Sequence, residues 1–136
     1  MVLAENQKIR ITSKAENIIL VERMIEDVCD VFNISEDYYG NILVAITEAV
    51  NNAIYHGNQA NPLKSIDIFF KSFNDHVSFI VKDEGTGFNF NNLPDPTNPE
   101  NIEKPNGRGV FLMRNLADKV SFEDNGSKVV LDFKVN

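Results

Sequence analysis

The chain has 136 residues, of which 43% are hydrophobic and 24% are charged. This composition is typical of a globular domain that can bury a core, and it excludes a largely disordered chain. The formal net charge of −7 at pH 7 makes nucleic acid and anionic membrane surfaces poor partners, because both require clustered Lys and Arg. A phosphate-bearing ligand would have to be held by backbone N–H groups, helix N-termini and a metal ion.

Three further features bear on where the protein works. The sequence has no run of about 18 apolar residues, so no membrane span is expected. Its first residues, MVLAENQKIRIT, lack the apolar core of a signal peptide, so we expect a cytoplasmic protein. The single cysteine, Cys29, excludes an internal disulfide and fits a reducing compartment. It falls in the apolar register of a predicted helix, which favours a buried thiol.

The first elements in chain order are a strand and a helix. Residues 6–12 alternate polar and apolar side chains, a pattern typical of a strand. Apolar residues then recur at three- and four-residue spacing as far as about Asn33, which predicts an amphipathic helix. Ser13 is expected to cap this helix, with Glu16 completing a capping box.

A second helix and two strands come next. The helix is expected over about 36–55, with Ser35 as its N-cap and Gly57 as its stop signal. Two runs rich in Ile, Val and Phe, 65–73 and 76–82, predict a hairpin that turns at Asn74 and Asp75.

The next stretch, from Asp83 to Arg108, is rich in Pro and Gly. A loop this long inside a compact domain is most often a lid, a binding loop or a disordered segment. Residues 109–118 then predict a short helix, and 119–124 and 127–135 predict a closing pair of strands. The order β-α-α-β-β-lid-α-β-β indicates an α+β fold, with helices on one face of a mixed or antiparallel sheet.

A first polar cluster lies late in the second predicted helix. Glu48, Asn52 and His56 are spaced four residues apart and therefore share one helix face. A carboxylate and a carboxamide one turn apart can hold Mg²⁺, which takes few protein ligands and completes its octahedron with phosphate and water. The alternative is a solvated polar face.

A second cluster, Asp83-Glu-Gly85-Thr-Gly87-Phe, follows an apolar strand directly. The glycines permit positive φ and close approach of the backbone to a ligand. Asp83, at the strand end, is well placed to accept a hydrogen bond from an exocyclic amine. The alternative is a turn that carries an acidic residue. The spacing matches neither a dinucleotide-binding fingerprint nor a P-loop.

A third cluster, Gly107-Arg108-Gly109-Val110, opens the short predicted helix. Unpaired N–H groups and the positive end of the helix dipole would converge there, which suits phosphate. Arg108 either adds a charged contact or is solvated. The two His residues and Cys29 have no spacing that indicates a transition-metal site.

Taken together and in this order, the clusters resemble the N, G1 and G2 boxes of the GHKL (Bergerat-fold) ATPases. Residues 48–57 look like the N box, 83–88 the G1 box and 107–113 the G2 box. The form Glu-Ala-Val-x-Asn-Ala-x-x-His-Gly most resembles the serine/threonine kinases that act as anti-sigma factors. The resemblance covers nearly the whole chain. It implies one histidine-kinase-like domain over 1–136, a two-layer α/β sandwich with a mixed sheet, and a lid at about 88–106.

The resemblance also implies roles for individual residues. Asn52 would ligate Mg²⁺, and Glu48 would act as general base toward the hydroxyl of a protein substrate. Asp83 would bind the amino group of adenine, with Gly87 letting the ring lie against the loop. Gly107 and Gly109 would present N–H groups to the phosphates. The remaining residues expected at the nucleotide are His56, Gly85, Arg108, Val110 and Ser127.

One departure from the family pattern concerns the last turn. Family members commonly carry Gly-Thr-Thr there, whereas this chain has Gly126-Ser127-Lys128. Ser127 keeps one hydroxyl and Lys128 replaces the other, which puts an adenine contact at that position in doubt.

The resemblance implies a kinase that uses ATP and Mg²⁺. It would phosphorylate a small antagonist protein on serine and would sequester a sigma factor or a similar transcription regulator. A homodimer is also expected. Two alternatives remain at this stage: a nucleotide-gated protein-binding module without catalysis, and a structural α+β domain whose glycine-rich loops are only turns.

Overall fold

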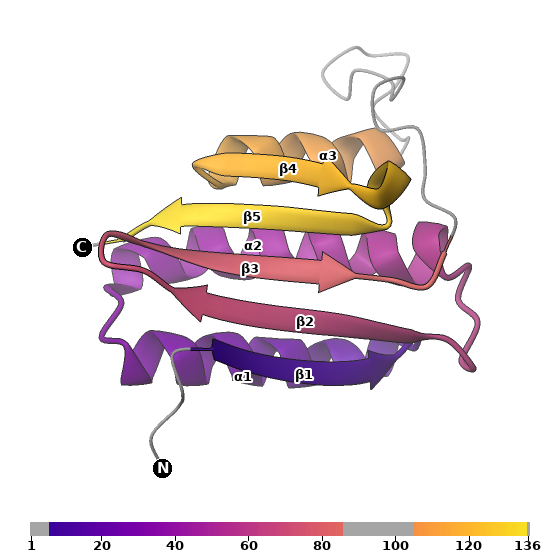
Figure 1. The fold of residues 1–136 in the computed structure, drawn as a ribbon, viewed down its shortest axis with the longest axis horizontal. Helices are drawn as coiled ribbons and strands as arrows, with labels where there is room; N and C mark the ends of the chain where they lie inside the picture. Colours follow the sequence, from indigo (N-terminus) through magenta and orange to yellow (C-terminus); the bar gives the residue numbers. More distant parts are fainter. Residues whose placement is uncertain (1–5, 86–104, 136) are drawn as a thin grey trace.

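The computed structural model describes residues 6–85 and 105–135. Its elements follow the expected order (Figure 1). They are β1 (Asn6–Thr12), the 3₁₀ turn η1 (Ala15–Asn17), α1 (Ile18–Val31), α2 (Glu36–Asn52), the π-helical turn η2 (Ala53–Gly57), β2 (Ser65–Ser72), β3 (His76–Lys82), α3 (Pro105–Leu116), β4 (Lys119–Glu123), the 3₁₀ turn η4 (Asp124–Gly126) and β5 (Lys128–Lys134).

The five strands form one sheet in the order β1-β2-β3-β5-β4, and each neighbouring pair is antiparallel. The mixed sheet implied by the resemblance is therefore wrong for the described strands, and the antiparallel alternative is right. The connections explain why. β2–β3 and β4–β5 are joined by short turns, which only antiparallel neighbours allow. The chain between β1 and β2 forms two successive helices, so it reverses three times and brings β2 back antiparallel to β1.

The helices cover one face of the sheet, so the protein is the two-layer α+β sandwich that the sequence predicts (Figure 1). The strands alternate, and in β2 the side chains of Ile66, Ile68 and Phe70 are all fully buried beneath the helices. Phe70 contacts the ring of Phe79, with 5.2 Å between the ring centroids. Full burial of one such side chain stabilises the fold by about 1.5–3 kcal/mol. The sheet thus packs closely against the helices through these buried side chains.

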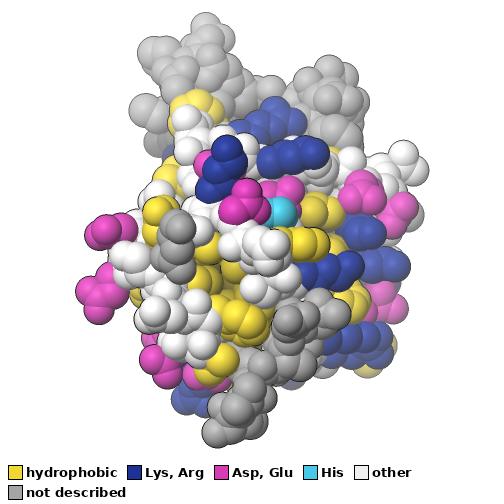
Figure 2. All heavy atoms as spheres, turned by 60° about the vertical axis from the view of Figure 1, so that its left-hand side comes forward, with side chains coloured by type: hydrophobic (Ala, Val, Ile, Leu, Met, Phe, Trp, Pro, Cys, Tyr) yellow, Lys and Arg dark blue, Asp and Glu magenta, His cyan; other side chains and the backbone are white. Residues whose placement is uncertain are grey.

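The opposite face of the sheet is uncovered and rich in basic side chains. In Figure 2 the Lys and Arg side chains gather along the right-hand side of the molecule. The strand register and burial pattern place on this face Lys8, Arg10, Lys71, Lys82, Lys119, Lys128 and Lys134. In contrast, α2 contains no Lys or Arg, and α1 contains only one, Arg23. The negative net charge is therefore unevenly distributed.

The two predicted N-caps have different outcomes. Ser35 caps α2 as expected, since its Oγ accepts a hydrogen bond from the N–H of Asp37 at 3.2 Å. The capping box of Ser13 and Glu16 is wrong. Ser13 is buried at 2% exposure, and its hydroxyl donates to the carbonyl of Lys64 at 2.8 Å. A tertiary partner thus uses the hydroxyl that the sequence pattern assigned to the helix.

The described part of the lid is small. Residues 86–104 lie outside the described ranges, and with them Gly87 and nearly all of the expected lid. Helix α3 begins at Pro105, four residues before the expected start, because proline fits the first position of a helix without losing an intrahelical bond. None of the helices in the described ranges is both long and apolar enough to cross a membrane.

Candidate functional site

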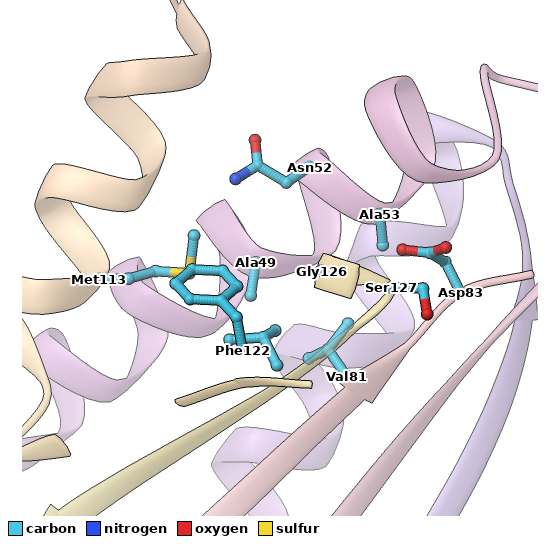
Figure 3. Close-up of a pocket in the computed structure, with 10 residues that line it drawn as sticks. Ala49, Asn52, Ala53, Val81, Asp83, Met113, Phe122, Gly126 and Ser127 are labelled. Atoms are coloured by element: carbon cyan, nitrogen blue, oxygen red, sulfur yellow. The ribbon is translucent and has the colours of Figure 1, made fainter. Parts of the chain in front are cut away.

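A pocket opens between α2, α3, β4 and the adjoining ends of β3 and β5 (Figure 3). Its cavity volume is only about 10 Å³, so the surrounding side chains leave room for little more than one water molecule. Its floor and one end are apolar, whereas Asp83 and Ser127 lie at the other end. The lining residues are Ala49, Asn52, Ala53, Val81, Asp83, Met113, Phe122, Gly126, Ser127 and Val129. An apolar slot with a few polar groups at one end is the usual form of a small-molecule site.

Asp83 supplies the carboxylate of this pocket. It directly follows β3, and its own N–H donates to the carbonyl of Ser127 at 2.9 Å, which continues the ladder between β3 and β5 by one bond. Its carboxylate accepts a hydrogen bond from the N–H of Gly85 at 2.7 Å. Asp83 is only 8% exposed, and this burial raises the pKa of its carboxyl group, against the opposing effects of the Gly85 N–H and of Lys64. A buried carboxylate with one bonded oxygen can accept a donor from a ligand through the other.

Two glycines let η2 approach the Asp83 loop closely. A Cβ atom on Gly57 would overlap the carboxyl group of Asp83, and one on Gly85 would overlap the carbonyl of Gly57. Any side chain at either position would therefore push the loop away from the helix. Gly85 thus belongs to the site through close backbone packing.

Ser127 stands at the base of the neighbouring turn. The turn has left-handed backbone conformations at Asp124, Asn125 and Gly126. The Ser127 hydroxyl donates to the carbonyl of Asp124 at 2.9 Å, which leaves its oxygen able to accept a hydrogen bond from a ligand. Lys128 points to the uncovered face of the sheet, where its Nζ lies 3.7 Å from Glu123 Oε1. The lysine at this position therefore does not line the pocket, and Ser127 does.

Asn52 lines the pocket from α2, and Glu48 lies near it beneath the first turns of α3 without lining the pocket. A Cβ atom on Gly109 would stand 3.1 Å from Glu48 Oε2 and 3.3 Å from Asn52 Oδ1. The two side chains therefore share the space that Gly109 leaves free. Their oxygens match the ligand preference of Mg²⁺, which needs only one or two groups from the protein. Within the described ranges no group of three or more His, Cys, Asp or Glu side chains could hold a metal ion, so other ligands would have to come from substrate and water.

The earlier start of α3 changes the relation of its two glycines to a phosphate. The first N–H groups of a helix have no intrahelical partner. Gly107 is the third residue of α3 and belongs to this set, whereas Gly109 is the fifth and lies in the second turn. Gly107 is thus suited to donate to an anion. The feature of Gly109 that the structure supports is the room it leaves for Glu48 and Asn52.

Of the expected residues in the described ranges, only Asn52, Asp83 and Ser127 line the pocket, and besides Glu48 and the expected glycines above, three more lie outside it. His56 lies in η2, half-buried, and burial lowers the pKa of its imidazole, which favours the neutral form. Arg108 is exposed in the first turn of α3. Val110 is buried in the core at 3% exposure, so only its backbone could reach a ligand. Gly87 lies outside the described residues, and its expected role remains a prediction.

The apolar lining of the pocket was not anticipated from the sequence. Met113 and Phe122 form one end of it, and Val81 lies on its floor. All three obey the periodicity of their elements, which indicates burial but does not separate a pocket wall from a core. Asn58 was also missed, although a polar residue directly after the Gly57 stop was the signal available. Its side chain is 1% exposed and bonded on all sides.

The family model of the histidine kinase-like ATPase domain matches residues 11–133 of this chain. The chain belongs to this family. The match covers every element except the first residues of β1 and the last residue of β5. All the residues that line the pocket lie within it. The family resemblance inferred from the three boxes is confirmed.

Relatives of this ATPase domain include proteins named serine-protein kinase RsbW. Those of Bacillus cereus (strain Q1), Bacillus thuringiensis subsp. konkukian (strain 97-27) and Bacillus anthracis (strain CDC 684 / NRRL 3495) are each 28% identical over 134 residues. The alignment covers 93% of this chain and 83% of each relative. A solved structure of the RsbU and RsbW domains of a protein from Mycobacterium tuberculosis superposes with a TM-score of 0.64 at 14% identity. It covers 96% of this chain, which spans 32% of that longer one, and it supports the fold alone.

Proposed function

We propose that this ATPase domain is a protein serine/threonine kinase that uses ATP and Mg²⁺ and regulates a transcription factor. The observation that carries the proposal is the arrangement of the pocket. A buried carboxylate, Asp83, closes one end of an apolar slot, and the Glu48–Asn52 pair lies under Gly109 beside it. The relatives named serine-protein kinase RsbW support the choice of a protein as the substrate.

The base of the nucleotide would occupy the apolar slot, and because the cavity is small its side walls would have to move apart to admit a ring. A flat ring gains from burial between Val81, Met113 and Phe122, and its exocyclic amine would donate to the free oxygen of Asp83. Ser127 is placed to contribute its hydroxyl oxygen at the same end. A buried acceptor left without its donor is costly, so the site favours a base with an amino group at that position over one with a carbonyl.

The phosphates would extend toward α3 and the Glu48–Asn52 pair. Asn52 would hold Mg²⁺, which neutralises charge on the phosphates and on the transferred group. The N–H of Gly107, in the first turn of α3, would bind a phosphate oxygen. Glu48 would accept the proton of the substrate serine as the serine oxygen attacks the γ-phosphorus and ADP leaves. His56 and Arg108 would lie at the margin of this site.

The protein partners are the furthest part of the proposal. The substrate would be a small antagonist protein, phosphorylated on serine, and the regulated factor would be a sigma factor or a similar regulator. The form of the N box supports this part, as do the names of the relatives. A nucleotide-gated binding module without catalysis would use the same pocket, and a phosphotransfer assay separates the two.

The test is calorimetric titration of ATP and ADP, with and without Mg²⁺, followed by a phosphotransfer assay. We expect wild type to bind both nucleotides and Asp83→Asn to bind neither measurably, because the variant places a donor where the amine must donate. Glu48→Gln should bind ATP as wild type does and should lose about 10²–10⁴-fold in turnover, the usual contribution of a general base.

The outcomes separate the alternatives. Absence of nucleotide binding by folded wild type would overturn the proposal as a whole. Nucleotide binding with no phosphotransfer to any candidate antagonist, and with the same behaviour in Glu48→Gln, would instead establish the non-catalytic module.

A further inference from the structure

We infer that Asn58 is a positioning residue of the nucleotide site, and that its buried carboxamide fixes the loop that carries Asp83. The inference rests on the proposed nucleotide site. Asn58 does not line the pocket, so it would act on the ligand only through this loop. Asn58 is 1% exposed, and a buried amide must find its hydrogen-bond partners within the protein.

The carboxamide of Asn58 joins three segments that are far apart in the sequence. Its Nδ2 donates to Ser13 Oγ at 2.8 Å, at the end of β1, and to the carbonyl of Ser65 at 3.0 Å, at the start of β2. Its Oδ1 accepts from the N–H of Glu84 at 2.8 Å, in the loop after β3. The reverse orientation of the amide would face donor to donor at Glu84 and acceptor to acceptor at Ser65. Only one orientation therefore satisfies all the partners.

The partners of Asn58 are themselves held in place. Ser13 uses both its N–H and its hydroxyl on the carbonyl of Lys64, at 3.1 and 2.8 Å, which leaves the hydroxyl oxygen to accept from Asn58. The carboxylate of Glu84 accepts a hydrogen bond from the N–H of Ser65. Asn58 is therefore held by the segments that join β1 to β2, and it in turn holds the backbone N–H of Glu84.

The position of Glu84 sets that of its neighbours. Asp83 is tied to Ser127 on the β5 side through its backbone N–H. Asn58 ties Glu84 on the α2 side, and the next N–H, of Gly85, bonds the Asp83 carboxylate at 2.7 Å. Hydrogen bonds to β5 and to Asn58 therefore fix the loop on both sides of Asp83, the residue that would bind the base. Removal of the Asn58 carboxamide leaves Glu84 held through its side-chain bond to Ser65 alone, so its backbone and that of Gly85 can shift, and with them the Asp83 carboxylate.

The variant to make is Asn58→Ala, measured by ATP and GTP titration and by amide hydrogen exchange at Glu84 and Gly85. We expect ATP affinity to fall about tenfold or more, because loss of a buried hydrogen-bond partner is of that size. The preference for ATP over GTP should shrink, since a carboxylate with a loose orientation discriminates the base less well. Exchange at the Glu84 amide should become faster without any nucleotide present.

The control is Ser78→Ala. Ser78 is also a buried polar residue, at 5% exposure, and it donates to Asp132 within the sheet. Neither Ser78 nor Asp132 lines the pocket. This variant should lose stability without changing nucleotide affinity, base preference or exchange at Glu84. A general loss of stability in Asn58→Ala would then be distinguishable from a loss of positioning.

A second variant covers the case in which Asn58→Ala does not fold. Ser13→Ala removes one partner of the carboxamide but leaves Asn58 Oδ1 as the acceptor of the Glu84 N–H, so faster exchange at Glu84 and weaker ATP binding are expected in milder form. If wild type binds ATP but a folded Asn58→Ala keeps its affinity, base preference and exchange protection, the inference is overturned and the proposed function survives. If wild type binds no nucleotide, the proposed function is overturned, and the inference falls with it whatever the exchange data show.

Discussion

At the scale of single residues, the burial of Asp83 suits ligand binding but lowers the free energy of unfolding. Burial raises the pKa of its carboxyl group, so the native state binds more protons than the unfolded state between the ordinary and the raised pKa. In that range its contribution to the free energy of unfolding falls as pH rises, and at neutral pH the buried charge is a constant cost. A ligand that donates a hydrogen bond to the carboxylate would offset this loss of stability.

A pH series of urea unfolding tests this description. Asp83→Asn removes the buried charge, so it should be at least as stable as wild type at neutral pH. Its advantage should shrink as pH falls and the wild-type carboxyl becomes protonated. Asp67→Asn is the control with the opposite sign: the hydrogen bond from Arg10 at 2.7 Å lowers the pKa of Asp67, so that carboxylate stabilises the fold at neutral pH and less in acid. A wild type that gains stability over Asp83→Asn as pH rises would contradict the argument.

At the scale of elements, the packing of α2 against α3 decides the geometry of the proposed catalytic pair. Gly40 and Gly109 lie on these two helices in opposite settings. A Cβ atom on Gly40 meets nothing within 4 Å, whereas one on Gly109 would stand 3.1 Å from Glu48 Oε2. Gly40→Ala should therefore raise the free energy of unfolding by about 0.5–1 kcal/mol, the usual difference between the two residues in a helix, and leave nucleotide turnover unchanged.

Gly109→Ala should behave differently. Its methyl group would displace Glu48 and Asn52 from the space they share, so turnover should fall by more than ATP affinity. Steady-state kinetics beside thermal unfolding of both variants make the comparison. Equal turnover in the two variants would show that the room left by Gly109 is immaterial.

The elements also show which parts of the structure the sequence alone predicts. Strands and helices are predicted almost to the residue where their pattern is local, as in β1 and the β2–β3 hairpin. Ser13 is misread because its partner, Lys64, lies 51 residues away in the chain, beyond the reach of any capping pattern. Asn52 and Asp83 are found because their motifs are short and polar. Met113 and Phe122 are not, because an apolar pocket wall and an apolar core have the same periodicity.

At the scale of the whole molecule, Cys29 reports on opening of the fold. It is 8% exposed on the buried side of α1, and burial raises the pKa of its thiol to about 11. Because the thiolate is the reactive form, little of it exists at neutral pH. We therefore expect iodoacetamide to label the native protein far more slowly than the urea-unfolded protein.

Nucleotide should slow this labelling further. A ligand that binds only the native state at 100 times its Kd adds about 2.7 kcal/mol to the free energy of unfolding, which corresponds to roughly 100-fold slower labelling through global unfolding. ADP and ATP titrated at fixed iodoacetamide provide the measurement. A rate that is fast and indifferent to saturating nucleotide would mean that Cys29 is reached through local opening of α1.

The π-helical turn η2 has a consequence for how this chain can vary. Its extra residue is visible in the hydrogen bond from the N–H of Asn58 to the carbonyl of Ala53, five residues back, at 2.8 Å. Each residue of a regular α-helix turns the chain by about 100°. Loss of one residue from this turn would leave Glu48 and Asn52 in place but would swing Gly57 and Asn58 out of reach of the Asp83 loop. The segment between the proposed metal ligand and the buried carboxamide should therefore accept many changes of residue type at Tyr55, which is half exposed, but no change of length.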